Sequence, residues 1–298
     1  MLIRDLQPHE WDSVAALIFH STNDWYQRNL NRPCFPGNDP SACRLFPEVY
    51  EALDPRCCLV AEIEGELAGS CFYHPRETHV SLGIMNADAK FSGRGVAKAL
   101  LKEVIGRADG LPVRLVSSAM NLDSFSLYTR EGFRPLAMYQ DMLLPEGKNL
   151  PPPSAKVRDA LPSDLAAILK LEQAISGIRR ESDWLALLHD PTGRWRGLVS
   201  EEEGEVMGFL FSINDPGCQM LGPGVMKSET AAFELIVAQL SGFQKAQPLF
   251  LVPAKATELV KKLYELGARN CELHVSQVLG EAQEPTGIVM PTFMPETG

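Results

Sequence analysis

The stretch KFSGRGVAKALL, Lys90 to Leu101, joins two glycines to the start of an apolar helical pattern. Gly93 and Gly95 flank Arg94. The apolar residues that follow are spaced as on one face of a helix: Val96, Ala99, Leu100 and Val104. Backbone N–H groups at a helix start lack intrahelical partners, and the helix dipole is positive there. The glycines therefore predict either a phosphate held at this helix start or a plain helix start without a ligand.

Strands and helices alternate around this stretch. A short strand near the N-terminus precedes a helical or looped segment over 11–50, and residues 56–85 predict three strands. The remaining elements predicted in the first half are a helix over 95–108, a strand over 112–118, a helix over 123–131 that ends at Gly132, and a strand over 133–144. This order predicts a mixed α/β sheet.

The second half of the chain repeats features of the first half in the same order. LVAEIEGELAG (59–69) and LVSEEEGEVMG (198–208) match at 7 of 11 positions, and each predicts a β-hairpin. Two further pairs are IRDLQPHEWDSVAAL (3–17) with VRDALPSDLAAIL (157–169), and LYTREGFR (127–134) with LYELGAR (263–269). The proline-rich KNLPPPSAK (148–156) predicts a linker, so we expect duplicated domains over 1–148 and 154–298.

Composition restricts the function classes. The 298 residues carry a formal net charge of -10, which argues against non-specific binding to nucleic acid or to an anionic membrane surface. The N-terminus has no long apolar run, so we expect neither a signal peptide nor a membrane span. The seven cysteines contain no CxxC, which predicts no metal site, reduced thiols and a cytoplasmic protein.

A second motif follows the predicted strand over 112–118. NLDSFSLYTREGF (121–133), together with SGRGVAKALL (92–101), resembles the GCN5-related N-acetyltransferase (GNAT) superfamily. Ser92 replaces the arginine or glutamine that usually opens the family's cofactor loop, and Lys90 is a candidate to compensate. The resemblance implies two tandem GNAT-like domains, each a mixed, splayed sheet flanked by helices.

The resemblance also implies acetyl-CoA as co-substrate and a set of residues that bind it. These are Met85, Asn86 and Ala87 on a strand, Gly93, Arg94, Gly95, Val96, Ala97 and Lys98 at the helix start, and Asn121 and Ser124 on the later helix. Tyr128 matches the tyrosine that often protonates the departing thiolate, and its alternative role is packing in the core. The resemblance predicts an N-acetyltransferase that acts on a primary amine of a small molecule by direct attack.

The acceptor site is less specified by the sequence. Residues 19–53 are rich in aromatic and amide side chains, and the candidates to bind substrate are Asn23, Asp24, Trp25, Tyr26 and His79. A surface helix pair with a packed Trp25 is the alternative interpretation. Candidates for the general base are His74, Glu77, His79 and Asp88, and a water chain could serve instead.

The second half lacks a counterpart of the glycine loop. Gly222–Pro223–Gly224 predicts a turn, but Pro223 offers no N–H to a phosphate, so the second domain is expected to be degenerate. The tail over 281–298 contains a strand-like apolar stretch. The alternative function is a non-catalytic acyl-CoA-binding sensor or scaffold module, and a monomer and a homodimer are equally compatible with the sequence.

Overall fold

The computed structural model describes residues 1–243 and 246–293 and divides them into two compact units. The first unit contains Met1–Pro75, His79–Val113 and Phe293, and the second contains Arg76–Thr78 and Arg114–Thr292. These units differ from the sequence repeats, because the strand that ends the first repeat pairs with strands of the second. The boundary over 148–154 therefore remains a prediction about the repeat. The last five residues of the predicted tail, 294–298, lie outside the described residues.

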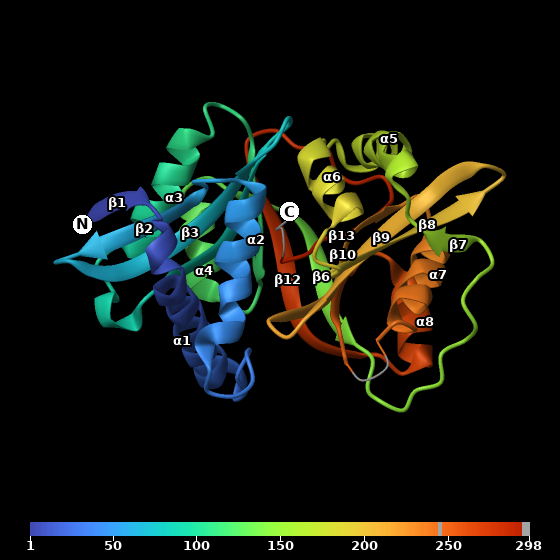
Figure 1. Cartoon of the computed structure of the whole chain (residues 1–298), viewed down its shortest axis with the longest axis horizontal. Coiled ribbons are helices and arrows are strands. Elements are labelled where there is room, and N and C mark those ends of the chain that lie inside the picture. Colours follow the sequence, from blue (N-terminus) through green and yellow to red (C-terminus); the bar gives the residue numbers. More distant parts are fainter. Residues whose placement is uncertain (244–245, 294–298) are drawn as a thin grey trace. The chain divides into compact units, whose positions relative to one another are not determined.

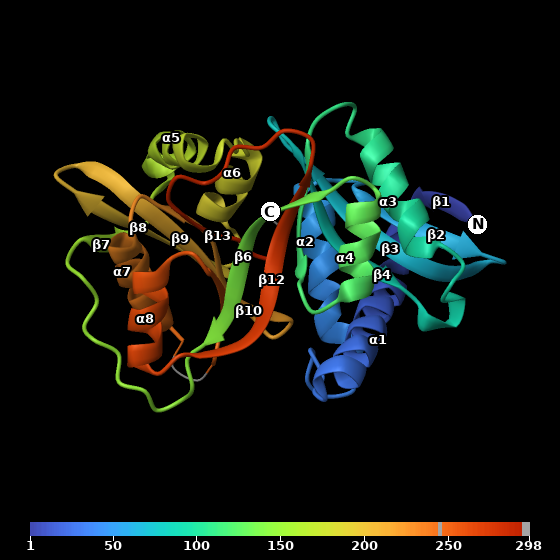
Figure 2. The ribbon, with the colours of Figure 1, turned by 180° about the vertical axis from the view of Figure 1, so that it is seen from behind.

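The first unit is an antiparallel sheet in the order β1-β2-β3-β4 with helices on both faces. Its strands are β1 (Leu2–Asp5), β2 (Cys58–Ile63), β3 (Glu66–Pro75) and β4 (Val80–Ala87). Its helices are α1 (Trp11–Leu30), α2 (Leu45–Leu53) and α3 (Val96–Arg107), with 3-10 turns η1 (Pro8–Glu10), η2 (Pro40–Arg44) and η3 (Ala89–Phe91). Figures 1 and 2 show α1 and α2 on one face and α3 on the other.

The sheet of the second unit runs in the order β5-β12-β6-β11-β10-β9-β8-β7, and β13 also pairs with β10. Its strands are β5 (Val113–Ser118), β6 (Arg134–Leu143), β7 (Val157–Asp159), β8 (Trp195–Glu202), β9 (Glu205–Asp215), β10 (Cys218–Met226), β11 (Leu249–Pro253), β12 (Arg269–Leu279) and β13 (Ile288–Met290). Its helices are α4 (Leu122–Arg130), α5 (Leu165–Ser176), α6 (Glu181–His189), α7 (Glu229–Leu240) and α8 (Thr257–Leu266), with the 3-10 turn η4 (Pro162–Asp164). The β10–β11 pair is parallel, so the sheet is mixed as predicted.

Both predicted hairpins are confirmed, and their turns have the same backbone. Glu64 and Gly65 connect β2 to β3 with φ angles of 56° and 82°. Glu203 and Gly204 connect β8 to β9 with φ angles of 52° and 82°. Two consecutive positive φ angles define the two-residue turn that matches the twist of antiparallel strands. The repeated E-G dipeptide in the sequence thus encodes the same local structure twice.

A repeated ion-pair network supports the duplication. In each repeat, an arginine of the first strand donates two hydrogen bonds to the acidic residue that ends the following 3-10 turn. The same guanidinium donates to an acidic residue at the end of the neighbouring strand. The two sets are Arg4, Glu10 and Glu62 in the first repeat, and Arg158, Asp164 and Glu201 in the second.

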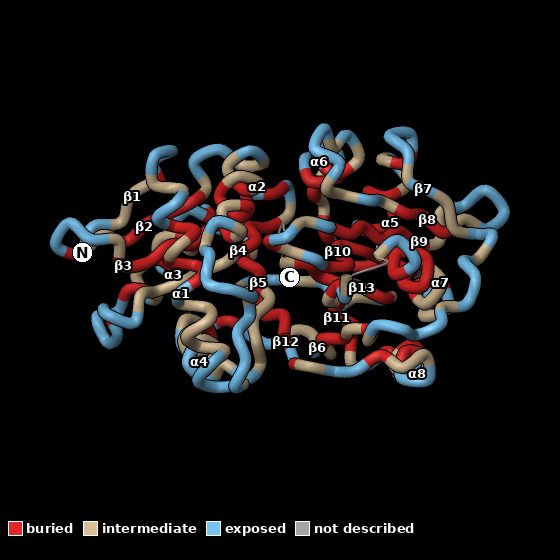
Figure 3. Tube along the Cα trace, turned by 60° about the horizontal axis from the view of Figure 1, so that its bottom comes forward, coloured by how far each residue is buried: buried red, intermediate tan, exposed pale blue. Residues whose placement is uncertain are grey.

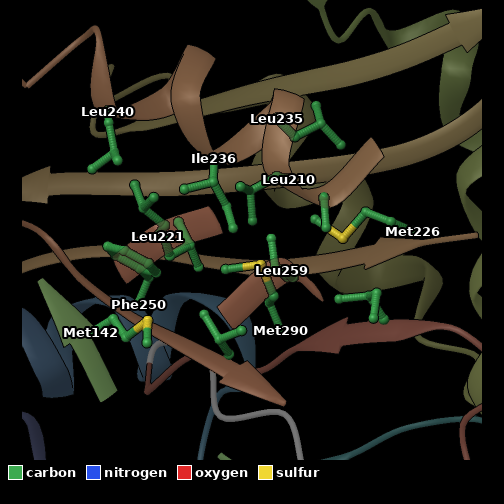
Figure 4. Close-up of a cluster of buried hydrophobic side chains, with 14 of the residues drawn as sticks. Met142, Leu210, Leu221, Met226, Leu235, Ile236, Leu240, Phe250, Leu259 and Met290 are labelled. Carbon is green, nitrogen blue, oxygen red and sulfur yellow. The ribbon is translucent and has the colours of Figure 1, made fainter. Parts of the chain in front are cut away.

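Helices cover both faces of the sheet around β9 in the second unit (Figure 1). Phe209 and Phe211 pack with Trp184 and other residues of α5 and α6, whereas Leu210 points to the opposite face. There Leu210 packs with Leu235 of α7 and with residues of α8, as Figure 4 shows. Because successive side chains of a strand alternate between faces, a strand buried on both faces is apolar throughout. Figure 3 shows the resulting buried strands and exposed connections.

The end of the first repeat is built into the sheet of the second. β12 lies between β5 and β6, and β6 lies between β12 and β11. Both pairings of β6 are antiparallel, with Asp141 opposite Glu272 on one side and Leu251 on the other. The repeats therefore exchange β6 and β12, which explains why compactness divides the chain at Val113 rather than in the linker.

All seven cysteines lie in the described residues, and none forms a disulfide, as predicted. Cys34 is exposed, whereas burial raises the pKa of the Cys43 thiol to about 12 and the pKa of Cys58 well above its usual range. Because the thiolate is the reactive form, we expect iodoacetamide at pH 8 to label Cys34 in the native protein and to spare Cys43 and Cys58. Peptide mass spectrometry after a timed quench checks this, and labelling of Cys58 without denaturant would contradict it.

Candidate cofactor-binding and active site

A glycine loop connects β4 to α3 in the first unit. Asp88 accepts a hydrogen bond from the Lys90 N–H at 2.8 Å and so begins η3, and the chain then turns through Gly93 and Gly95. Their φ angles are 77° and 76°, a left-handed conformation that side chains disfavour, and a Cβ at either position would meet no atom within 4 Å. The space beside both glycines is therefore open.

The start of α3 has no side-chain cap. Gly95 is its N-cap residue, and the helix runs for 12 residues from Val96. A residue such as serine or aspartate at this position would satisfy an orphan N–H group, but glycine cannot. The helix thus presents its first N–H groups and its positive dipole end toward the glycine loop. Val96 is buried, Ala97 is half-buried and Lys98 is exposed.

A glycine in β3 holds α3 close to the sheet. A Cβ on Gly69 would lie 2.5 Å from Val96 Cγ1 and 2.8 Å from the backbone oxygen of Asn86. The helix start can approach the end of β4 this closely because Gly69 has no side chain. The equivalent residue of the second repeat, Gly208, is packed in the same way against Met226 and Leu235.

The basic side chains of the loop are paired with acidic residues of the β2–β3 hairpin. Lys90 contacts Glu66, and Arg94 Nη2 lies 3.1 Å from Glu64 Oε1. Both cations also lie over the Phe91 ring, at 5.3 and 5.8 Å from its centroid. All four charged side chains are about half exposed or more, so water screens these pairs and an anionic ligand can compete for the cations.

The three predicted strand residues end β4 and are half-buried: Met85, Asn86 and Ala87. Asn86 Nδ2 donates to Ser21 Oγ at 2.8 Å and to Thr22 Oγ1 at 3.2 Å, both on α1. Asn86 Oδ1 is buried and accepts no hydrogen bond within the described residues. Ser21 and Thr22 could not be predicted as partners of Asn86, because residues so far apart in the chain meet only through the packing of α1 on β4.

Asn121, Ser124 and Tyr128 lie on α4, which belongs to the second unit. Asn121 is the N-cap residue, and its Oδ1 accepts a hydrogen bond from the Ser124 N–H at 3.1 Å. Tyr128 is 5% exposed, and its ring centroid lies 5.8 Å from that of Phe133. The motif thus shapes the start of α4 and buries its tyrosine.

The predicted acceptor residues of α1 are half-buried and already make contacts. Asn23 Oδ1 accepts hydrogen bonds from the N–H groups of Cys34 and Phe35, and its Nδ2 donates to the Phe35 oxygen. Asp24 forms an ion pair with Arg28 at 2.8 Å, and the Trp25 and Tyr26 rings meet edge to face at 5.1 Å. Asn23 therefore holds the chain that follows α1.

The candidate bases lie in different surroundings. His74 is 1% exposed and its Nδ1 lies 2.6 Å from Asp54 Oδ2, while Glu77 Oε1 accepts a hydrogen bond from the Glu181 N–H. His79 is 2% exposed, with its Nε2 3.1 Å from Ser81 Oγ. Asp88 already serves as the cap of η3.

The corresponding connection of the second repeat is short and internally satisfied. Only Lys227 and Ser228 separate β10 from α7. Ser228 Oγ accepts a hydrogen bond from the Ala231 N–H, and so caps α7. Glu229 Oε2 accepts a hydrogen bond from the Leu259 N–H in the first turn of α8, at 2.6 Å. Side chains of the protein thus occupy the starts of α7 and α8.

The predicted turn at Gly222–Pro223–Gly224 was wrong, because these residues lie inside β10. The register of the β9–β10 pair shifts between Leu221 and Gly224, so the strand absorbs extra residues as an irregularity. The residues of β10 from Met220 to Met226 are all buried, which keeps this glycine- and proline-containing segment in the sheet.

Comparison with known proteins supports the family resemblance of the sequence motifs. Residues 25–133 match the sequence model of the Acetyltransferase (GNAT) family. The whole chain has the tandem GNAT fold: it resembles a tandem GNAT protein from the clavulanic acid biosynthesis pathway with a TM-score of 0.61 and 13% identity, over 95% of this chain and 99% of that one.

Two further structures resemble nearly the whole chain. A protein from Pyrococcus horikoshii assigned as an acetyltransferase has a TM-score of 0.74 and 16% identity, over 98% of this chain and 95% of its own. A GCN5-related N-acetyltransferase from Sphaerobacter thermophilus has a TM-score of 0.61 and 15% identity, over 93% and 95%. A search of curated proteins found no match. Among the described helices, none is both long and apolar enough to cross a bilayer.

Proposed function

We propose that this protein is an acetyl-CoA-dependent N-acetyltransferase that acetylates a primary amine of a small molecule. One observation carries the proposal: the two repeats differ at the helix start that would hold the pyrophosphate. The first repeat has an open glycine loop before an uncapped α3, whereas the second has a two-residue connection and a serine cap. A plain helix start needs no such loop, and the second repeat demonstrates this within the same chain.

The first repeat fits the cofactor by its chemistry. The N–H groups from Val96 to Lys98 would receive the pyrophosphate, and Arg94 would exchange its exposed pair with Glu64 for the anionic ligand. The buried Oδ1 of Asn86 would accept a hydrogen bond from an amide N–H of the pantetheine arm, which satisfies an atom that otherwise lacks a donor. The family motif also assigns Asn121 and Ser124 to cofactor binding.

When bound, acetyl-CoA supplies an acetyl group activated as a thioester. The chain's own groups orient it and move protons. Backbone N–H groups at the end of β4, near Met85 and Ala87, would stabilise the negative charge that develops on the carbonyl oxygen. Tyr128 would donate its phenolic proton to the departing thiolate as general acid. The α1 residues Trp25 and Tyr26 and the buried His79 remain candidates to contact the amine.

The sequence predictions also bear on the compartment of this activity and on the kind of acceptor. We place it in the cytoplasm, with a free small molecule as acceptor, since a net charge of -10 disfavours a nucleic-acid-bound substrate. We further propose that the second repeat binds no acetyl-CoA, because Ser228 and Glu229 fill the helix starts that a cofactor would need. Its contribution is a scaffold, in which β11 and β12 pair with β6 of the first repeat.

Gly95→Glu tests the cofactor site directly. Calorimetric titration of acetyl-CoA should show micromolar binding to the intact chain and at least about tenfold weaker binding to Gly95→Glu, which places a side chain and a negative charge at the helix start. Gly110→Glu is the matched control: Gly110 follows the other end of α3, also has a positive φ of 85° and also faces open space. It should bind as the wild type does.

The outcomes of this titration distinguish the proposed acetyltransferase from general strain in the variants and from a non-catalytic acyl-CoA sensor. Equal loss of acetyl-CoA binding in Gly95→Glu and Gly110→Glu would indicate general strain. It would contradict a cofactor site at the start of α3. No binding of acetyl-CoA to the wild type would overturn the proposed function. Binding without turnover against a panel of primary amines would instead favour the acyl-CoA-binding sensor.

A further inference from the structure

Three ionisable side chains converge on one face of the β6–β12 pair in the second unit. Asp141, Glu272 and His274 each offer one ligand atom, and these atoms all lie within 4.8 Å of one another. Asp141 is completely buried, and Glu272 and His274 are each 5% exposed. The three residues come from both repeats, since β6 belongs to the first and β12 belongs to the second.

A β-bulge brings the second carboxylate to this face. Asn270 pairs with Met142 and Glu272 pairs with Asp141, so Cys271 is an extra residue in β12. Without the bulge, Cys271 would lie opposite Asp141, and Glu272 would lie opposite Gln140 on the other face. The bulge therefore moves both Glu272 and His274 to the buried side beside Asp141.

This arrangement concentrates negative charge in the interior. His274 Nδ1 lies 2.8 Å from Asp141 Oδ1, while Asp141 Oδ2 accepts no hydrogen bond from the described residues. Within those residues, no lysine or arginine forms an ion pair with Asp141 either. Burying two carboxylates whose ligand oxygens lie within 4.8 Å of each other is costly unless a positive charge compensates them. The cluster thus has the donors of a cation site, and it includes a fully buried carboxylate oxygen that no described residue supplies with a hydrogen bond.

We propose that Asp141, Glu272 and His274 bind one divalent transition-metal ion, with zinc as the ion that suits this donor set. One imidazole nitrogen and two carboxylate oxygens are ligands that zinc takes, and three protein ligands leave a fourth position for water. The prediction of no metal relied on cysteine spacing, whereas these ligands lie up to 133 residues apart in the chain. The ion would tie the exchanged strands together, and this inference is independent of the proposed acetyl transfer.

Metal uptake by the full-length chain tests the site. After removal of metal with a chelator, titration against a chromophoric competitor should show one equivalent of Zn²⁺ bound. Co²⁺ in its place should give the visible absorption bands of a tetrahedral site. Asp141→Asn and His274→Gln should each weaken zinc binding at least about tenfold, and Glu272→Gln should do the same while preserving the side-chain volume.

His74→Gln is the matched control. His74 is also buried and lies 2.6 Å from a carboxylate, Asp54, in the other unit, but it belongs to no such three-ligand cluster among the described residues. Its zinc uptake should equal that of the wild type. Thermal unfolding adds a readout independent of the competitor: zinc should raise the Tm of the wild type and of His74→Gln, and leave the Tm of the ligand variants unchanged.

Two results would overturn the site. One is a wild-type chain that takes up no zinc or cobalt, which needs no variant to interpret. The other is a full equivalent of zinc retained by folded Asp141→Asn and Glu272→Gln, which would place the ion elsewhere. Circular dichroism of each variant establishes that it is folded before its uptake is compared.

Discussion

Tyr128→Phe is expected to lower kcat of acetyl transfer between about 10²- and 10⁴-fold, the range for loss of a positioned general acid. The substitution removes one oxygen and keeps the ring that packs near Phe133, so the fold should persist. Acetyl-CoA affinity should change little, because the proton transfer matters in the transition state rather than in the bound complex. Thiol release with an accepted amine measures kcat, and calorimetry measures the affinity.

Tyr264→Phe is the matched control for this prediction. Tyr264 occupies the equivalent place in the second repeat, is 46% exposed, and donates a hydrogen bond to Gln140 Oε1 at 2.6 Å. Removal of its hydroxyl should leave kcat within about twofold of the wild type, since a surface hydrogen bond contributes little. An unchanged kcat in Tyr128→Phe would assign Tyr128 to packing and remove it from the mechanism.

Glu172→Ala is expected to destabilise the chain by about 3–5 kcal/mol, because it removes the nearer of the two carboxylates paired with the buried Arg180 and leaves only Asp183 at 3.9 Å. Glu172 is 1% exposed, and burial raises its pKa. Its Oε1 accepts from Arg180 Nε at 2.8 Å, and its Oε2 accepts from Trp184 Nε1 at 2.7 Å. The Arg180 guanidinium also lies 4.3 Å from the centroid of the Trp184 ring.

Urea unfolding of the full chain, followed by tryptophan fluorescence, measures this loss of stability; Trp184 and Trp195 report on the second unit, and Trp11 and Trp25 on the first. Glu202→Ala is the comparison, because the Glu202–Lys156 pair is about half exposed and water screens it, so its loss should be much smaller than that of Glu172. Replacing Glu172 and Arg180 together by methionine should cost less than Glu172→Ala alone, since no charge is then left unpaired. Equal losses for Glu172→Ala and Glu202→Ala would contradict the prediction.

Local signals in the sequence were sufficient to predict the two hairpin turns and the helices α3 and α4. The E-G dipeptides fixed both hairpin turns, since a positive φ at two successive residues depends on the residues themselves. The helix predicted over 95–108 spans Val96–Arg107, and the helix predicted over 123–131 spans Leu122–Arg130. Gly95 and Asn121 begin these helices, and such boundaries depend on neighbours within one turn.

Non-local pairing was not predictable in the same way. The tripeptide at Gly222–Gly224 has the composition of a turn, but burial on both sides keeps it in β10. Partners of the candidate site such as Ser21 and Thr22 reach Asn86 across more than sixty residues of chain, a distance that no periodicity encodes. Asn23 likewise was a candidate to bind the acceptor substrate because of its residue type. In the structure its side chain instead accepts hydrogen bonds from the backbone that follows α1.

The sequence by itself determined the repeat, the glycine loop and the family motifs, because each depends on residues adjacent in the chain. Only the tertiary structure decided that β6 joins the strands of the second repeat and that a bulge at Cys271 sets Glu272 beside Asp141. Strand partners are selected by the apolar surface that they bury together, and one inserted residue reverses which side chains face inward. A buried cluster assembled from two repeats therefore exists only in the folded chain.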